Sequence, residues 1–183
     1  MKVTGMLVSD KGVSLRAIRM DDAAAISLLA NNREVSRHLR DVFPYPYQLT
    51  DARFFIELAL GGKLGYVWVI EWNETLTGVL SLQPQADVYR HSVEIGYWLG
   101  QPFWGRGIAS SGVSLACAHA FEELGLHRIY AGIFAPNIAS MKVLERNGFV
   151  REGIRQLAIL KDGELHDEHL FALLKQNYAA ADR

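Results

Sequence analysis

The stretch SVEIGYWLGQPFWGRGIA, residues 92–109, decides the fold prediction because three kinds of local structure follow one another in it. Its first part, Ser92–Leu99, is rich in β-branched and aromatic residues and predicts a strand. Gly105 and Gly107 then predict a tight turn, and an apolar helical pattern begins near Ile108. The stretch therefore predicts a strand that leads through a glycine turn into a helix.

The turn between this strand and this helix has the features of an anion site. Glycines let a ligand approach the backbone, and the first N–H groups of a helix have no partner inside the helix. The helix macrodipole favours negative charge at this end, and Arg106 adds a positive charge. Taken alone, an isolated G-x-G is more typical of a plain corner. The turn also lacks the Lys-Ser/Thr of the Walker pattern and the third small residue of the dinucleotide fingerprint.

On both sides of this stretch the chain alternates between strands and helices, without a repeat or a linker. Two prolines in Phe43–Tyr47 remove backbone donors and predict an irregular loop, and Asn73–Thr75 predicts a hairpin turn. The expected helices are one that Asp21 caps and that ends near Asn31, a short one at Arg33–Arg40, Asp51–Leu60 with Thr50 as cap, Ile108–Leu124, and Ile138–Asn147, which Gly148 ends. The expected strands are Val13–Ile18, Tyr66–Trp72, Leu76–Gln83, Ser92–Leu99, Arg128–Phe134 and two closing strands joined at Asp162–Gly163.

This order of elements predicts an α+β or mixed α/β fold. With 183 residues, 50% of them hydrophobic, the chain can bury one substantial core but is short for two enzyme domains, so we expect a single domain over residues 1–183. The 19 basic and 20 acidic residues balance, which argues against nucleic acid or an anionic membrane as partner. One cysteine, no signal-peptide pattern in the first ten residues and no apolar run of ~20 residues lead us to expect a cytoplasmic protein.

A second segment makes the interpretation of the glycine turn more specific. Asn137–Phe149 reads NIASMKVLERNGF. In this order and at these separations, the strand Ser92–Leu99, the turn and this segment resemble the GNAT N-acetyltransferase superfamily. Within it, the chain resembles the ribosomal-protein serine and alanine N-terminal acetyltransferases, over about Val13–Leu174. Trp104 departs from the superfamily signature, which begins with Gln or Arg, but tryptophan is usual at this position in that group.

The resemblance implies a central mixed, mostly antiparallel sheet, flanked by helices, whose middle strands splay apart around acetyl-CoA. It implies that backbone groups near Trp98 and Leu99, together with Asn137, bind the pantetheine arm. It is also compatible with a homodimer. The residues implied for the pyrophosphate are Gly105, Arg106, Gly107, Ile108, Ala109 and Ser110.

Acetyl transfer from a thioester to an amine requires a neutral amine, a polarised carbonyl and a proton for the departing thiolate. Glu94 is the candidate base, acting through water, because it is a carboxylate in an otherwise apolar strand beside the expected splay; the alternative is a solvated outward residue. Ser140 is the candidate acid, because the resemblance places a serine there beside the thioester; the alternative is a role in capping the helix.

Two other features suggest chemistry but have simpler structural interpretations. Cys117 lies within an apolar helical pattern and is expected in the core. His166 and His169 would face opposite sides of a strand, so they are not expected to share a metal ion, and we expect no metal cofactor.

The sequence leads to one main hypothesis and two alternatives. The main hypothesis is an acetyl-CoA-dependent N-acetyltransferase whose acceptor is the N-terminal α-amine of a peptide or protein, such as a ribosomal protein. The first alternative keeps the reaction but uses a small-molecule amine, such as a polyamine, an amino-acid derivative or an amine antibiotic. The second is a non-catalytic regulator that binds acyl-CoA. The sequence leaves the acceptor open.

Overall fold

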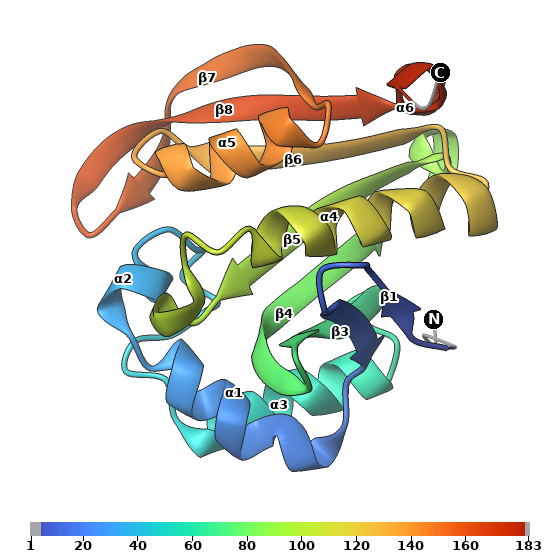
Figure 1. The fold of residues 1–183 in the computed structure, drawn as a ribbon. Helices are drawn as coiled ribbons and strands as arrows, with labels where there is room; N and C mark the ends of the chain where they lie inside the picture. Colours follow the sequence, from blue (N-terminus) through green and yellow to red (C-terminus); the bar gives the residue numbers. More distant parts are fainter. Residues whose placement is uncertain (1–4, 182–183) are drawn as a thin grey trace.

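The computed structural model describes residues 5–181, and its strands form one sheet (Figure 1). The strands are β1 (Leu7–Val8), β2 (Val13–Ala17), β3 (Tyr66–Trp72), β4 (Thr75–Pro84), β5 (Ser92–Leu99), β6 (Arg128–Phe134), β7 (Val150–Lys161) and β8 (Glu164–Leu174). Their spatial order is β1-β2-β3-β4-β5-β6-β8-β7. All neighbours are antiparallel except β5 and β6, which run parallel. The mixed, mostly antiparallel sheet confirms the predicted fold class.

Helices cover both faces of this sheet (Figure 1). On β3, Trp68 and Ile70 belong to the core beneath the helices that follow β5 and β6, whereas Val67 and Val69 belong to the core beneath the early helices. Because both faces are covered, β3 reads as an almost continuous apolar run rather than an alternating one. The helices are α1 (Ala23–Ala30), α2 (Arg33–Ser36), α3 (Leu49–Leu60), α4 (Ile108–Ala118), α5 (Ile138–Arg146) and α6 (Lys175–Ala181).

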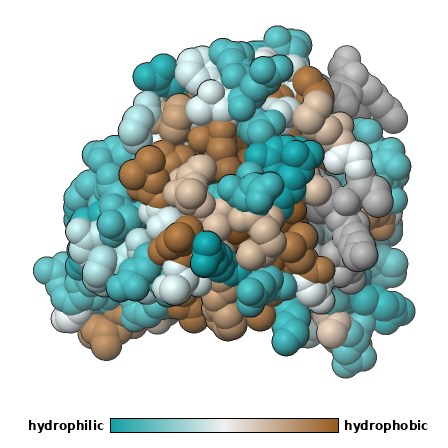
Figure 2. Space-filling model, turned by 90° about the horizontal axis from the view of Figure 1, so that it is seen from below, coloured by the Kyte–Doolittle hydropathy of each residue, from teal (hydrophilic) through white to brown (hydrophobic). Residues whose placement is uncertain are grey.

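The outer surface of the molecule on the side of α1 and α3 carries apolar side chains among polar ones (Figure 2). Leu28 of α1 and Phe54 of α3 are exposed there. Single exposed apolar side chains of this kind are ordinary on folded proteins. The site residues predicted from the sequence lie elsewhere, near the middle of the sheet.

The middle of the sheet opens between β5 and β6. These strands pair only between Ser92–Glu94 and Arg128–Tyr130. Beyond this point β5 stays paired with β4 up to Leu99, while β6 stays paired with β8 up to Phe134. The two strands therefore follow different neighbours and diverge, which is the splay that the resemblance implies.

β5 alternates regularly along its whole length, since its register with β4 shows no shift. Val93 and Ile95 point into the core beneath α4, and Trp98 packs against the core beneath α1 and α3. Glu94 shares the face of Trp98, whereas Tyr97 shares the face of Ile95. Two polar groups of one strand thus lie on opposite sides of the sheet.

Two predicted helix caps are wrong. Asp21 does not cap the first helix: a 3-10 turn precedes α1, and the Asp22 carboxylate accepts the Arg19 N–H at 2.7 Å. Thr50 lies inside α3, because Gln48 is the N-cap and its N–H donates to Asp51 at 2.7 Å. In both places a carboxylate three residues further on accepts one backbone N–H ahead of the helix, so the caps shift.

Two predicted helices are shorter than expected. The helix predicted over Arg33–Arg40 ends at Ser36, and Asn32 caps its start by accepting the Glu34 N–H. The helix predicted to reach Leu124 is α-helical only to Ala118 and then continues as a π-helical turn. The apolar pattern predicted the existence of these helices, but it does not specify where the hydrogen-bond period changes.

Gly78 of β4 lies where a side chain cannot fit. An added Cβ would be 2.1 Å from the backbone oxygen of Trp98 on β5. We therefore expect Gly78→Ala to force β4 and β5 apart and to lower the free energy of unfolding by roughly 3 kcal/mol, as overpacking does. Urea unfolding measures this difference. Gly153→Ala on β7, where a Cβ meets nothing within 4 Å, is the matched control, and equal stability of the two variants would contradict the prediction.

Candidate functional site

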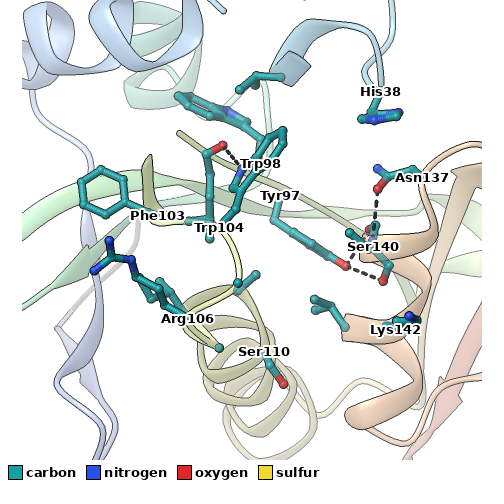
Figure 3. Close-up of a pocket in the computed structure, with 18 of the residues that line it drawn as sticks. His38, Tyr97, Trp98, Phe103, Trp104, Arg106, Ser110, Asn137, Ser140 and Lys142 are labelled. Atoms are coloured by element: carbon teal, nitrogen blue, oxygen red, sulfur yellow. Dashed lines mark hydrogen bonds between the residues drawn. The ribbon is translucent and has the colours of Figure 1, made fainter. Parts of the chain in front are cut away.

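A cavity of about 320 Å³ lies where β5 and β6 diverge (Figure 3). The end of β5, the glycine turn, the first turns of α4 and α5 and one side of α2 form its walls. This volume is at the lower end of the range for small-molecule sites. All the residues predicted for the cofactor line the cavity, together with Ser140: Trp98, Leu99, Gly105, Arg106, Gly107, Ile108, Ala109, Ser110 and Asn137.

The glycine turn has a backbone that only glycine adopts without strain. Gly105 has φ 75° and Gly107 has φ 78°, and Gly107 is the N-cap of α4. The Ser111 N–H is bonded to the Gly107 carbonyl, so the amides before it lie ahead of the helical ladder. A Cβ at either glycine would meet nothing within 4 Å, so glycine is required here by the conformation and not by crowding.

Trp104 and Arg106 use their side chains to hold the turn. The Trp104 indole Nε1 donates to the Leu99 carbonyl at 2.8 Å, which ties the turn to the end of β5. The Arg106 guanidinium lies 5.3 Å from the centre of the Trp72 ring on β3. Trp104 therefore stabilises the turn at a position where the superfamily signature carries a polar side chain. The sequence did not predict this role.

Ser140 is fixed at the start of α5 by two neighbours. The Asn137 side chain accepts the Ser140 N–H at 3.1 Å and so caps the helix. The Ser140 hydroxyl lies 2.8 Å from the hydroxyl of Tyr97. Figure 3 shows the two side chains directed toward each other. The cap is thus the Asn137 side chain. The Ser140 hydroxyl contacts the Tyr97 hydroxyl and takes no part in capping the helix.

Tyr97 is a site residue that the sequence analysis did not select. Its hydroxyl also lies 3.2 Å from the Ser140 carbonyl, and burial raises the pKa of Tyr97 above its ordinary value. A signal was present in the sequence: alternation places this hydroxyl on an otherwise apolar face with Ile95 and Leu99.

Glu94 does not line this cavity, although it lies on the same face of β5 as Trp98, which does. It occupies the last position at which β5 pairs with β6, directly before the splay. Its side chain is 26% exposed and forms an ion pair with Arg40, whose side chain is 68% exposed. The structure therefore brings Ser140 and the predicted cofactor residues together around one cavity. Glu94 lies outside this cavity, at the point where β5 and β6 begin to diverge.

A second, polar cavity of about 270 Å³ adjoins the first and shares Glu34 and His38 with it. It lies between α2, the turn of the β7–β8 hairpin and the chain that follows β6. Burial and the positive charge of Arg37 lower the pKa of His38, so its imidazole is mostly neutral near pH 7. The sequence did not predict this cavity, because its walls come from distant parts of the chain. Its charged residues are Arg33, Glu34, Arg37, Lys161, Asp162 and Glu164.

Cys117 has no exposed reactive thiol, and His166 of the two strand histidines lines the second cavity. Cys117 is buried, and burial raises the pKa of its thiol to about 12, so it carries no thiolate near pH 7. Within the described chain, no group of three or more His, Cys, Asp or Glu side chains is arranged to hold a metal ion. None of the helices between residues 5 and 181 is long and apolar enough to cross a bilayer.

Comparisons with known proteins agree with this geometry. The family model described as acetyltransferase (GNAT) domain matches residues 13–150. The uncharacterized N-acetyltransferase YoaA of Bacillus subtilis (strain 168) is 32% identical over 165 residues, which are 88% of this chain and 92% of the relative. The ribosomal protein uS5-alanine N-acetyltransferase of Escherichia coli (strain K12) is 32% identical over 83 residues, 45% of this chain and 43% of the relative. A solved structure of RimL, the ribosomal L7/L12 alpha-N-protein acetyltransferase, in complex with coenzyme A has a TM-score of 0.83 at 25% identity and covers 93% of this chain and 98% of that chain.

Proposed function

Because the chain belongs to the GNAT acetyltransferase family and is an N-acetyltransferase, we propose that it transfers acetyl from acetyl-CoA to the N-terminal α-amine of a peptide or protein, such as a ribosomal protein. One observation carries the proposal: the glycine turn lines a cavity at the splay between β5 and β6, and a polar cavity with balanced charges adjoins it at Glu34 and His38. The proposal assigns the whole chain to one acetyltransferase domain, with a core from Val13 to Leu174.

The first cavity is proposed to hold acetyl-CoA. The amides of Gly105–Ser110 would bind the pyrophosphate, since the turn and the helix start offer N–H groups and a favourable dipole. The pantetheine arm would follow the β6-facing edge of Trp98 and Leu99, where β5 has left its parallel partner. The Asn137 amide nitrogen could bind the same arm, because capping uses only the side-chain oxygen. The complex of RimL with coenzyme A supports this assignment.

The polar cavity favours a peptide α-amine over a polyamine. A polycation would be recognised by an excess of carboxylates. Here three basic side chains, Arg33, Arg37 and Lys161, accompany three carboxylates, and Arg33 pairs with Asp162 at 2.6 Å. Such a balanced lining suits the alternating donors and acceptors of a peptide backbone. Two of the similar proteins described above are ribosomal-protein acetyltransferases, which supports the same class of acceptor.

The proposed chemistry uses Glu94 and Ser140 from the two sides of β5. Glu94 would take one proton from the acceptor ammonium through water, and the neutral amine would attack the thioester carbon. The C–N bond forms, the C–S bond breaks, and its electron pair stays on sulfur. Ser140 would give its proton to the sulfur and regain one from the amine nitrogen. Because exposed ion pairs contribute little, the acceptor ammonium can replace Arg40 as the partner of Glu94.

The acceptor is tested by thiol release from acetyl-CoA. Synthetic peptides with an unblocked N-terminal serine or alanine are compared with the same peptides carrying an acetylated N-terminus, with spermidine and with an aminoglycoside. We expect turnover with the unblocked peptides and none with the blocked ones. Turnover of spermidine or the aminoglycoside without turnover of any peptide would overturn the proposed acceptor and favour a small-molecule amine.

A further inference from the structure

The Tyr97 side chain links the strand on one side of the splay to the helix on the other. Tyr97 belongs to β5, and its hydroxyl meets Ser140 at the start of α5, which follows β6. Both residues line the cavity proposed for acetyl-CoA (Figure 3). The contact joins residues 43 positions apart, so it exists only because the fold brings these elements together.

The two contacts of the Tyr97 hydroxyl differ in quality. It lies 2.8 Å from the Ser140 Oγ, the ordinary length of an O–H···O hydrogen bond, and 3.2 Å from the Ser140 carbonyl, which is longer than usual. The carbonyl belongs to the first turn of α5, where the helical ladder supplies its own donor. The single phenolic proton is therefore used best on the Ser140 Oγ.

This donation decides where the proton of Ser140 points. A serine hydroxyl carries one proton and accepts through its lone pairs. When Tyr97 donates, the Ser140 proton is left for another acceptor, and among residues 5–181 the structure records no hydrogen bond from the Ser140 hydroxyl to any other side chain. A hydroxyl that accepts a hydrogen bond also becomes a better donor, because hydrogen bonds in a chain polarise one another.

We propose that Tyr97 is a positioning residue that donates its hydrogen bond to the Ser140 Oγ and thereby directs the Ser140 proton to the departing sulfur. This inference rests on the proposed function, since it assumes that Ser140 serves the thiolate. Tyr97 itself stays protonated: burial raises its pKa, so it remains a donor over the working pH range. Ser140 loses its proton to sulfur and regains one from the amine nitrogen, and Tyr97 exchanges none.

A double-mutant cycle tests the inference, with kcat measured for the wild type, Tyr97→Phe, Ser140→Ala and the double variant. We expect Ser140→Ala to lower kcat about a hundredfold, as loss of an acid does. Tyr97→Phe should lower kcat about tenfold, which is the scale of one lost hydrogen bond. In the Ser140→Ala background, Tyr97→Phe should change kcat less than about twofold, because its target is gone.

Other measurements distinguish a role of Tyr97 in orienting the Ser140 hydroxyl from a role in stabilising the fold alone. Thermal unfolding and calorimetric acetyl-CoA binding of all four proteins show whether Tyr97→Phe damages the fold or the cofactor site, and the KM for acetyl-CoA is expected to stay within about twofold of the wild type. Tyr66→Phe on β3, a half-buried tyrosine away from α5, is the matched control and should leave kcat unchanged. An unchanged or higher kcat for Tyr97→Phe would overturn the inference, as would equal losses in both backgrounds.

The choice of acceptor keeps this test distinct from that of the proposed function. The cycle is run with an unblocked peptide, with spermidine and with water, since slow hydrolysis of acetyl-CoA releases the same thiolate. Coupling with spermidine or water but no turnover of any peptide would support the inference and overturn the proposed acceptor. Turnover of peptides with equal effects of Tyr97→Phe in the presence and absence of Ser140 would support the proposed acceptor and overturn the inference. A wild type that releases no thiol under any condition would overturn both.

Discussion

Gly107→Val is expected to weaken acetyl-CoA binding roughly thirtyfold, which isothermal titration calorimetry measures directly. Gly107 caps α4 with φ 78°, in the left-handed region, where any other residue costs roughly 1–2 kcal/mol and a β-branched one more. The free variant should relax to negative φ and turn its amides away from the proposed phosphate site. Binding must then restore the strained turn, and about 2 kcal/mol corresponds to a factor of about 30 in Kd.

Gly125→Val separates this effect from backbone strain in general. Gly125 also has positive φ, at 63°, and a Cβ there also meets nothing within 4 Å, but it lies between α4 and β6, at the other end of α4 from the turn. Both variants should lose stability to a similar degree, whereas only Gly107→Val should lose affinity. Equal affinity of the two variants for acetyl-CoA would remove the turn from the proposed cofactor site.

Glu94→Gln should lower kcat/KM for an unblocked peptide about a hundredfold near pH 7, the scale of general-base catalysis. An α-amine has a pKa of about 8, so roughly a tenth of it is neutral at about pH 7 and most of it at about pH 9. The need for a base thus falls as pH rises. The ratio of wild-type kcat/KM to that of Glu94→Gln should therefore fall about tenfold between about pH 7 and about pH 9. Rates measured across the range give the profile.

Glu145→Gln, an exposed carboxylate on α5, is the matched control for the loss of one negative charge. It should follow the wild-type profile at every pH. The affinity of Glu94→Gln for acetyl-CoA should equal that of the wild type, because Glu94 lies outside the cavity proposed for the cofactor. A deficit of Glu94→Gln that is the same at all pH values would show that Glu94 does not take the proton.

The sequence was most informative where a local conformational preference decides the structure. Gly105 and Gly107 predicted the turn, and the structure places both at positive φ, which a side chain makes costly. The runs Tyr66–Trp72 and Leu76–Gln83 predicted a hairpin. The structure contains it, and Asn73 and Glu74 both adopt positive φ in its two-residue turn. These features depend on a few neighbouring residues.

Helix boundaries were predicted less well, although they too depend on neighbouring residues. Thr50 is a good cap by residue type, but the N-cap is Gln48, two residues earlier, whose N–H donates to the Asp51 carboxylate. The apolar pattern did not predict the π-helical turn from His119 to Glu123. Several residues can satisfy the same free backbone groups, and the tertiary structure selects among them.

The sequence by itself determined the order of elements, the glycine turn and the resemblance that joins them, because each rests on short-range preference or on motif spacing. Only the tertiary structure decided which residues far apart in the sequence meet. Tyr97 reaches Ser140 across 43 residues, Arg40 reaches Glu94 across 54, and Lys161 reaches Asp41 across 120. These contacts depend on the order of strands in the sheet and on the divergence of β5 from β6, which burial over the whole chain fixes and no local pattern encodes.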